Sequence, residues 1–260
     1  APALEPGASR VLRFEYRGEM FERLEDDWIA LLSSSDWYPR TAFTVPTTWD
    51  LDFTYPARMQ LLASGQRTED RSEGAVRHSR WVQTRPTPLA SFDLGYFRGI
   101  EVTNDSLPPL TVWAHHVDGA GRVVRRTFAE LAASRRYDDQ VALDVARAVV
   151  SMQRLNGPAL APTWNAVETP RLRFEAFPGL VHLMPLANKR LPGAQYSPEL
   201  YRYHEIAHQW WGLGVRPATY RDTWLAEGFA SFLSIHHPAT ALSQPAIRGT
   251  VLAAWQQEIQ

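Results

Sequence analysis

Residues Tyr201–Trp211 read Tyr-Arg-Tyr-His-Glu-Ile-Ala-His-Gln-Trp-Trp and contain the pattern His-Glu-x-x-His. On a helix, His204 and His208 lie one turn apart on the same face, so both can direct an imidazole nitrogen at one point. Neutral imidazole is a good zinc ligand. Glu205 stands beside the first histidine, where a carboxylate is suited to take a proton from a metal-bound water. The stretch therefore predicts a helix that carries a metal site.

The sequence also specifies both ends of this helix. Ser197 is suited to cap the N-terminus, Pro198 fits the first helical position, and Gly212 is expected to stop the helix. The short pattern by itself leaves an alternative open, because His-Glu-x-x-His also occurs by chance in amphipathic helices whose histidines are structural.

A second helix is predicted over Asp222–Phe232, with Asp222 as its N-cap and an end before Pro238. Glu227 lies inside it. Its apolar neighbours are Trp224, Leu225, Phe229 and Phe232. A carboxylate buried among such residues is costly unless it is paired, so Glu227 is expected to be paired or bound to metal. Two histidines and one glutamate leave a fourth zinc position open, as in catalytic sites.

The two stretches together resemble the gluzincin aminopeptidases, the family of aminopeptidase N and the leukotriene hydrolases. The resemblance rests on His-Glu-Ile-Ala-His-Gln-Trp-Trp-Gly, on Trp-Leu-Ala-Glu-Gly-Phe-Ala, and on the eighteen residues that separate His208 from Glu227. It is strong over residues 197–232 and looser elsewhere.

This resemblance implies a zinc metallopeptidase that hydrolyses peptide bonds in the manner of an aminopeptidase. One Zn²⁺ per chain is expected on His204, His208 and Glu227. Glu205 is expected to act as the general base that activates a zinc-bound water. The family also implies a peptide substrate and a thermolysin-like, mainly helical peptidase domain.

The composition excludes several other classes of function. The chain has 260 residues, of which 45% are hydrophobic and 21% charged, as in ordinary globular proteins. A net charge of −1 gives no electrostatic reason to expect nucleic acid as a partner, and no apolar run is long enough for a transmembrane helix. Cysteine is absent, which excludes disulfides and thiolate ligands. The compartment stays undetermined, with a secreted or periplasmic location preferred from the habit of the family.

The predicted fold class is α+β. Short strands with alternating polarity, such as Trp49–Tyr55, predict an N-terminal antiparallel β sandwich or saddle over residues 1–120. The zinc-peptidase domain is expected over residues 121–260, C-terminally incomplete, and it begins with predicted helices over Arg125–Tyr137 and Asp139–Leu155. The predicted strands are Val11–Tyr16, Ala42–Val45, Trp49–Tyr55, Met59–Ala63, Ala75–Thr84, Leu89–Leu94, Leu110–His116 and Leu172–Phe177.

Three features depart from the family pattern. The aminopeptidases carry a glutamate in a G-x-M-E-N stretch that holds the substrate's N-terminal ammonium; here Gly179–Leu183 is aligned with that stretch, so His182 replaces the carboxylate. The family's oxyanion-binding tyrosine lies downstream of the third ligand, and no tyrosine follows Glu227. Ala226 stands where the family has asparagine. A further C-terminal domain is therefore expected in the full-length protein.

Two rivals to an aminopeptidase stay open at this point. The first is a catalytically impaired, peptidase-like scaffold that binds peptides or a protein partner, which the altered G-x-M-E-N stretch favours. The second is an endopeptidase on the same fold, because an imidazole cannot anchor an ammonium as a carboxylate does.

Overall fold

The computed structural model describes residues 5–15, 17–18, 22–23, 28–31, 37–39, 45–116, 121–159, 161–169, 174–183 and 198–259. Its strands are β1 (Glu22–Arg23), β2 (Ile29–Ala30), β3 (Thr47–Pro56), β4 (Gln60–Ala63), β5 (Gln66–Glu73), β6 (Val76–Thr87), β7 (Phe92–Gly95), β8 (Phe97–Thr103), β9 (Leu110–His115), β10 (Val123–Thr127), β11 (Trp164–Glu168), β12 (Glu175–Phe177) and β13 (Leu180–Leu183). Its helices are α1 (Phe128–Ala133), α2 (Tyr137–Asn156), α3 (Pro198–Ala207), the 3₁₀ turn η2 (Tyr220–Asp222), α4 (Thr223–Ala241) and α5 (Ala246–Ile259).

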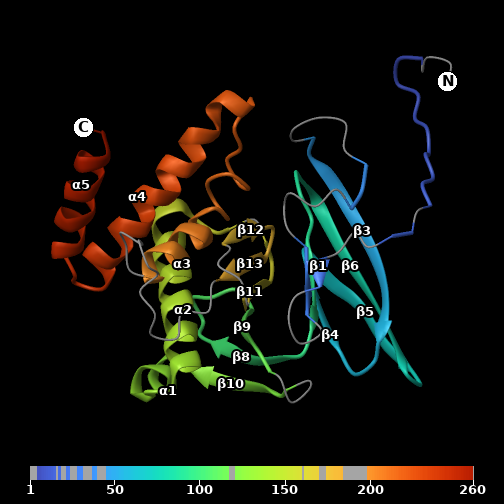
Figure 1. Ribbon diagram of the computed structural model, residues 1–260, viewed down its shortest axis with the longest axis horizontal. Coiled ribbons are helices and arrows are strands. Elements are labelled where there is room, and N and C mark those ends of the chain that lie inside the picture. Colours follow the sequence, from blue (N-terminus) through green and yellow to red (C-terminus); the bar gives the residue numbers. More distant parts are fainter. Residues whose placement is uncertain are drawn as a thin grey trace.

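The N-terminal part consists of two antiparallel sheets, ordered β1-β2-β7-β4 and β3-β6-β5. In β3 the predicted alternation is confirmed, because Trp49, Leu51 and Phe53 are partly covered while the residues between them are exposed. Leu51 and Phe53 pack on a core cluster that contains Tyr55, Trp81 and other buried residues of these sheets. Figure 1 shows these sheets on the opposite side of the molecule from the helices.

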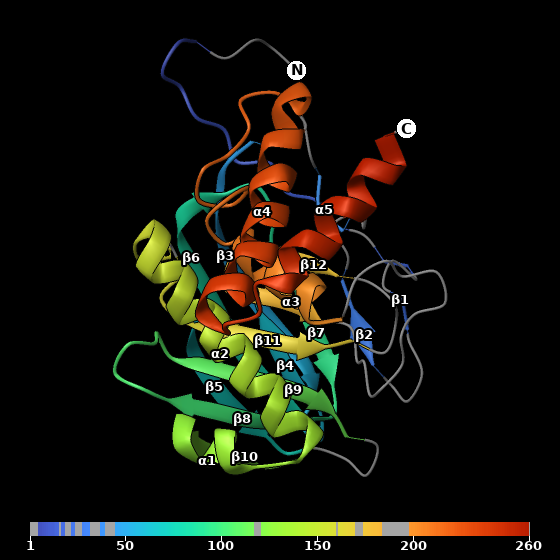
Figure 2. The ribbon, with the colours of Figure 1, turned by 90° about the vertical axis from the view of Figure 1, so that its left-hand side faces the viewer.

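A mixed sheet, ordered β10-β8-β9-β11-β13-β12, forms the middle of the molecule. The pairs β10–β8, β9–β11 and β11–β13 are parallel, and the edge strand β12 runs antiparallel to β13. Helix α2 packs on β8 and β9 and contacts α3 and α4 (Figures 1 and 2). Its buried face shares one large core with the sheet and with α3 and α4. The mixed α+β class predicted from the sequence is therefore confirmed.

One predicted helix is wrong in its first part. Arg125–Tyr137 was expected to be helical, but Val123–Thr127 forms strand β10 because it pairs in parallel with the edge of β8. The helix begins only after Thr127, whose side chain accepts a hydrogen bond from the Glu130 amide while the Glu130 carboxylate accepts one from the Thr127 amide. The pairing with β8 overrides the local helical preference.

Three predicted helix ends also need correction. α3 ends at Ala207 rather than at Gly212, although the His208 amide still donates to the His204 carbonyl at 3.3 Å. α4 continues through Pro238 to Ala241, and the buried residues Ile235, His237 and Pro238 hold this part of the helix against the core despite the missing amide. Asp222 precedes α4, yet its carboxylate accepts bonds from Thr219 of the preceding turn.

Some predictions lie outside the described residues, among them the Ser197 cap and most of the strand Ala42–Val45. The described part of Val11–Tyr16, residues 11–15, forms no strand. The six-stranded sheet combines strands from both sides of residue 120. We therefore propose a domain boundary at Tyr96, which separates β7 of one sheet from β8 of the next.

Among the described helices, none has the length and apolar character required to cross a membrane.

Glu168 at the end of β11 predicts a pH-dependent stability. Burial raises its pKa to about 7, although the Tyr137 hydroxyl donates a hydrogen bond to it at 3.0 Å. The folded state therefore holds the proton more tightly than the unfolded state, and stability present below pH 4.5 is lost as the pH rises to about 7. We expect Glu168→Gln to abolish this loss of about 3 kcal/mol, measured by urea unfolding at pH 4.5 and pH 7.5.

The matched control is Glu101→Gln, which removes a surface carboxylate that pairs with Arg125 on β10. It is expected to leave the pH dependence unchanged. An equal pH dependence in the parent chain and in Glu168→Gln would contradict the assignment to Glu168.

Candidate metal centre

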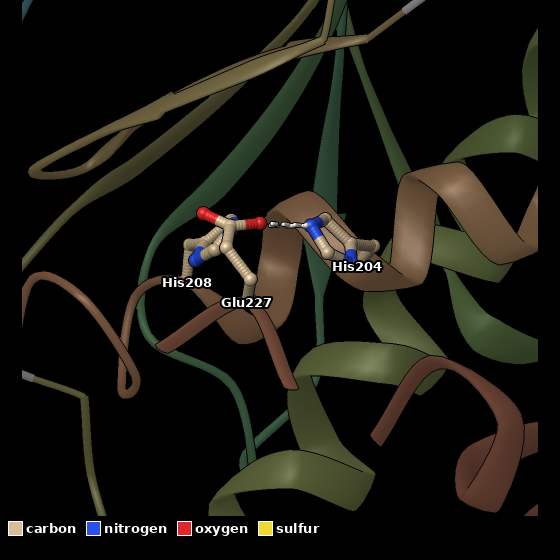
Figure 3. Close-up of side chains that lie close together, drawn as sticks. All are labelled: His204, His208 and Glu227. Atoms are coloured by element: carbon tan, nitrogen blue, oxygen red, sulfur yellow. Dashed lines mark hydrogen bonds and ion pairs between the residues drawn. The ribbon is translucent and has the colours of Figure 1, made fainter. Parts of the chain in front are cut away.

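The predicted metal ligands come from α3 and α4 and converge on one point. The Nε2 atoms of His204 and His208 are 3.0 Å apart, and Glu227 Oε2 lies 3.2 Å from the first and 3.5 Å from the second. Figure 3 shows the Glu227 carboxylate over the two imidazoles, which project from the same face of one helix. Two imidazoles and one carboxylate form a donor set that suits zinc, so these three side chains could hold a metal ion.

The second nitrogen of each ring has a partner that fixes the ring. His208 Nδ1 lies 2.9 Å from the Trp211 carbonyl, which requires Nδ1–H as the donor and leaves Nε2 as the free donor atom for a metal. His204 Nδ1 lies 3.4 Å from the Ser231 hydroxyl on α4. In other proteins, hydrogen bonds of this kind to the second ring nitrogen orient the histidines that bind a metal.

Gly212 follows the helix in a conformation that suits glycine. Its φ is +113°, and a Cβ atom there would lie 3.3 Å from His208 Nδ1. The Gly212 amide donates to the Val215 carbonyl at 2.8 Å, which closes a short loop after the helix. Glycine at this position thus lets the chain turn away from the metal centre without crowding His208.

Glu227 is not buried among apolar neighbours as the sequence predicted. Its side chain is 55% exposed, and Trp224, Leu225 and Phe232 also face outwards. Hydrogen bonds from the two histidines, rather than burial, hold its pKa below the usual range of a glutamate. The ring of Phe229, two residues after Glu227 on α4, stacks on Trp211 with ring centroids 4.1 Å apart and ties the turn that follows α3 to α4.

Glu205 is the buried carboxylate of the site. Its exposed fraction is 8%, and burial raises its pKa although the positive fields of His208 and His204 act in the opposite direction. Glu205 and the three candidate ligands line one cleft of about 340 Å³. A second cavity of about 380 Å³ reaches His204 and Glu205 from the side of α5. The carboxylate therefore stands where the walls of two cavities meet.

Glu175 is a residue of the cleft that the sequence reasoning missed. It lies on the edge strand β12, is half-buried, and lines the same cleft as the candidate ligands. It also helps to raise the pKa of Glu205. The available signal was a lone carboxylate within the apolar predicted strand Leu172–Phe177, of which residues 174–177 are described.

His182 does not take the place of this carboxylate. It lies on β13, is 1% exposed, and bonds Asp93 of β7 through Nε2 at 2.8 Å. The Trp28 indole donates to the other oxygen of Asp93 at 3.3 Å. Gly179–Leu183 itself brings no carboxylate to the cleft; the carboxylate there comes from Glu175 on β12, the strand partner of His182.

Gln209 connects the end of α3 to the β12–β13 hairpin. Its side-chain amide donates to the Phe177 carbonyl at 2.8 Å and accepts from the Gly179 amide at 3.1 Å. Gly179 has a φ of +69°, and a Cβ atom there would lie 2.6 Å from the Thr163 carbonyl oxygen. The turn and the buried amide together set the strand that carries Glu175 against the helix that carries the histidines.

Helix α3, helix α4 and the edge strand thus present the features of a gluzincin-type metal centre. Comparison with known proteins agrees with this class. Residues 199–259 match the Peptidase family M1 domain, which confirms the predicted resemblance for this part of the chain. Aminopeptidase O of Homo sapiens is 38% identical over 60 residues, which are 23% of this chain and 7% of that protein.

Solved structures resemble a much larger part of the chain. The M1 zinc metallopeptidase from Deinococcus radiodurans matches with a TM-score of 0.60 at 23% identity. The match covers 82% of this chain and 47% of that protein. A variant of the M1 zinc metallopeptidase from Deinococcus radiodurans, bound to a Tyr-Ser-Ala substrate, matches with a TM-score of 0.60 at 21% identity. This match covers 83% of this chain and 47% of that protein. At these identities the likeness concerns the fold, and the chain spans about half the length of these proteins.

The donor set predicts the metal stoichiometry. The purified chain, supplied with zinc and dialysed without chelator, is expected to retain about one zinc per chain by elemental mass spectrometry. Glu227→Ala is expected to lose it, because only the two imidazoles then remain. Glu199→Ala, on the same helix as the histidines but outside the cleft, is the control and should keep the metal. Retention of zinc by Glu227→Ala would contradict this ligand set.

Proposed function

We propose that the chain carries the zinc centre of an aminopeptidase-like metallopeptidase that hydrolyses peptide bonds. The observation that supports this most is the convergence of His204, His208 and Glu227 beside a buried carboxylate in an open cleft. A structural zinc site would be closed by four protein ligands, whereas three ligands in a cleft leave room for substrate. The match of residues 199–259 to family M1 supports the same conclusion.

In this proposal His204, His208 and Glu227 hold the zinc ion, and Glu205 is the general base. Bound zinc would act as a Lewis acid that polarises the scissile carbonyl and lowers the pKa of water. Glu205 takes a proton from the attacking water and delivers it to the leaving amide nitrogen. Its burial suits this role, because a carboxylate with a raised pKa is the stronger base.

Glu175 is the group that we propose to bind the substrate's N-terminal ammonium. It provides a carboxylate on the wall of the cleft, at the edge strand β12. A charged hydrogen bond from an ammonium to this carboxylate is strong in a half-buried setting. β12 is also the edge strand of the six-stranded sheet among the described residues, and such an edge suits pairing with an extended peptide backbone. This arrangement favours an aminopeptidase over an endopeptidase.

The oxyanion donor of the reaction is not assigned within the cleft. None of the described residues that line it is a tyrosine. Because the structural relatives are about twice as long as the part matched here, we propose that a further C-terminal domain supplies this donor in the full-length protein.

Replacing the general base should separate metal binding from catalysis. Glu205→Gln is expected to keep about one zinc per chain, because Glu205 is not a ligand, and to lower kcat for a peptide substrate by roughly a hundredfold or more. The comparison is made in the longest active form of the protein, with Glu199→Gln as a control that should keep both properties. Normal turnover by Glu205→Gln would rule out its role as general base.

Removal of the proposed ammonium anchor should affect one substrate class alone. Glu175→Gln is expected to weaken kcat/KM for peptides with a free N-terminus by about tenfold to a hundredfold. N-acetylated peptides, which lack the ammonium, should be poor substrates of the parent enzyme and change little. Equal cleavage of free and acetylated peptides would favour the endopeptidase, and cleavage of neither by the zinc-loaded, full-length protein would favour the scaffold.

A further inference from the structure

His182 is a buried titratable residue that the proposed mechanism does not use. Its exposed fraction is 1%, and that of its partner Asp93 is 0%. Nε2 of His182 lies 2.8 Å from a carboxylate oxygen of Asp93, whereas Nδ1 has no hydrogen-bond partner among the described residues. A single polar contact to β7 therefore fixes the ring of this residue on β13.

His182 is also the direct strand partner of Glu175. The two residues lie opposite each other in the antiparallel pair β12–β13. Residues so paired point to the same face of a sheet, with their Cβ atoms about 4.5–5.5 Å apart. Phe177, two residues after Glu175 on that face, packs against the imidazole with ring centroids 5.3 Å apart. The proposed ammonium anchor thus has a buried histidine as its neighbour across the strands.

The strand that carries Glu175 is short and lies at the edge of its sheet. β12 spans three residues and pairs with β13 alone among the described strands. The side-chain amide of Gln209 holds this hairpin from the side of α3. The bond between His182 and Asp93 holds β13 from the side of β7. The position of Glu175 in the cleft therefore depends on both contacts.

The charges around His182 favour its protonated form. Burial lowers the pKa of His182, but neighbouring carboxylates act in the opposite direction and raise it above the usual value of a histidine. These carboxylates belong to Asp93 on β7, Glu175 on β12 and Glu205 on α3. The Trp28 indole beside Asp93 is uncharged and donates its N–H to that carboxylate. The imidazolium is therefore the favoured form of the buried ring.

We propose that His182 is a positioning residue of the ammonium subsite: held by Asp93, it places its strand partner Glu175 and offsets the negative charge around the cleft. This inference rests on the proposed function of Glu175 as the anchor of the substrate's N-terminus. Glu175, Glu205 and Glu227 line one cleft, and their carboxylates repel one another unless positive charge lies nearby. His182 is not among the residues that line the cleft, so its charge acts from inside the fold and leaves Glu175 accessible to an ammonium group.

The coupling of the two side chains is measured first, without a substrate. Histidine ring NMR is expected to show that the pKa of His182 falls by about half a pH unit in Glu175→Gln, because one of the surrounding negative charges is lost. The matched control is Glu101→Gln, which removes a carboxylate that pairs with Arg125 on β10 and should leave the titration of His182 unchanged. An identical titration of His182 in the parent chain and in Glu175→Gln would overturn the proposal.

Kinetics of the longest active form of the protein then measures the positioning role. His182→Gln keeps an N–H donor for Asp93 but removes the charge. It is expected to raise KM for peptides with a free N-terminus about fivefold to tenfold, with little change in kcat. In the Glu175→Gln background the same change should alter KM less than about twofold, because both residues act on one contact with the substrate.

A role in folding alone predicts a different result. His182→Gln would then lower kcat/KM by the same factor with and without Glu175, and this outcome would refute the positioning role. Val181→Ala, which removes packing from the opposite face of β13, is the control and should act independently of Glu175. If Glu175→Gln alone leaves kcat/KM for free peptides unchanged, the ammonium anchor itself is refuted, and the NMR comparison separately decides whether His182 and Glu175 are coupled.

Discussion

The hydrogen bonds of the buried Gln209 amide are the interaction on which the site depends most. Gln209 follows the second histidine directly, and its side chain forms hydrogen bonds with Phe177 at the end of β12 and with Gly179 in the β12–β13 turn. One amide group thus sets the distance between the helix of the candidate ligands and the strand of Glu175. Its donor and acceptor are both satisfied in the core, so replacing it by an apolar residue would leave two backbone groups unpaired.

The metal centre was predictable from the sequence because its geometry is local. His204 and His208 share one helix face at any position in any fold, and Glu227 needs only a second helix packed on the first. Glu175 was missed because strand pairing, not spacing, brings it to the cleft. For the same reason Arg125–Thr127 was predicted as helix although it belongs to β10, since the partner strand β8 lies about twenty residues earlier. The exposure of Glu227 depends on what covers α4, which helical periodicity does not reveal.

The buried acidic residues Asp93 and Glu205 differ in the partners of their carboxylates. Asp93 and His182 are both almost fully buried, and they satisfy each other at 2.8 Å with support from Trp28. Glu205 is nearly as buried, yet its neighbours are the candidate ligands, and no described side chain forms a hydrogen bond or ion pair with its carboxylate. The first arrangement stabilises the packing between two sheets, and the second is what the proposed role of Glu205 as proton acceptor requires.

The passage from β7 to β8 has a mechanical consequence. A single residue, Tyr96, joins β7 of the N-terminal sheet to β8 of the central sheet. Near this connection, Asp93 of β7 bonds His182 of the central sheet. Pro88 and Leu89, which form one wall of the cleft, lie just before this corner. A hinge needs a few residues that can absorb rotation, and a single residue between two paired strands leaves little room for one. The wall of the cleft formed by Pro88 and Leu89 is therefore expected to move together with the N-terminal sheet and the central sheet as one piece.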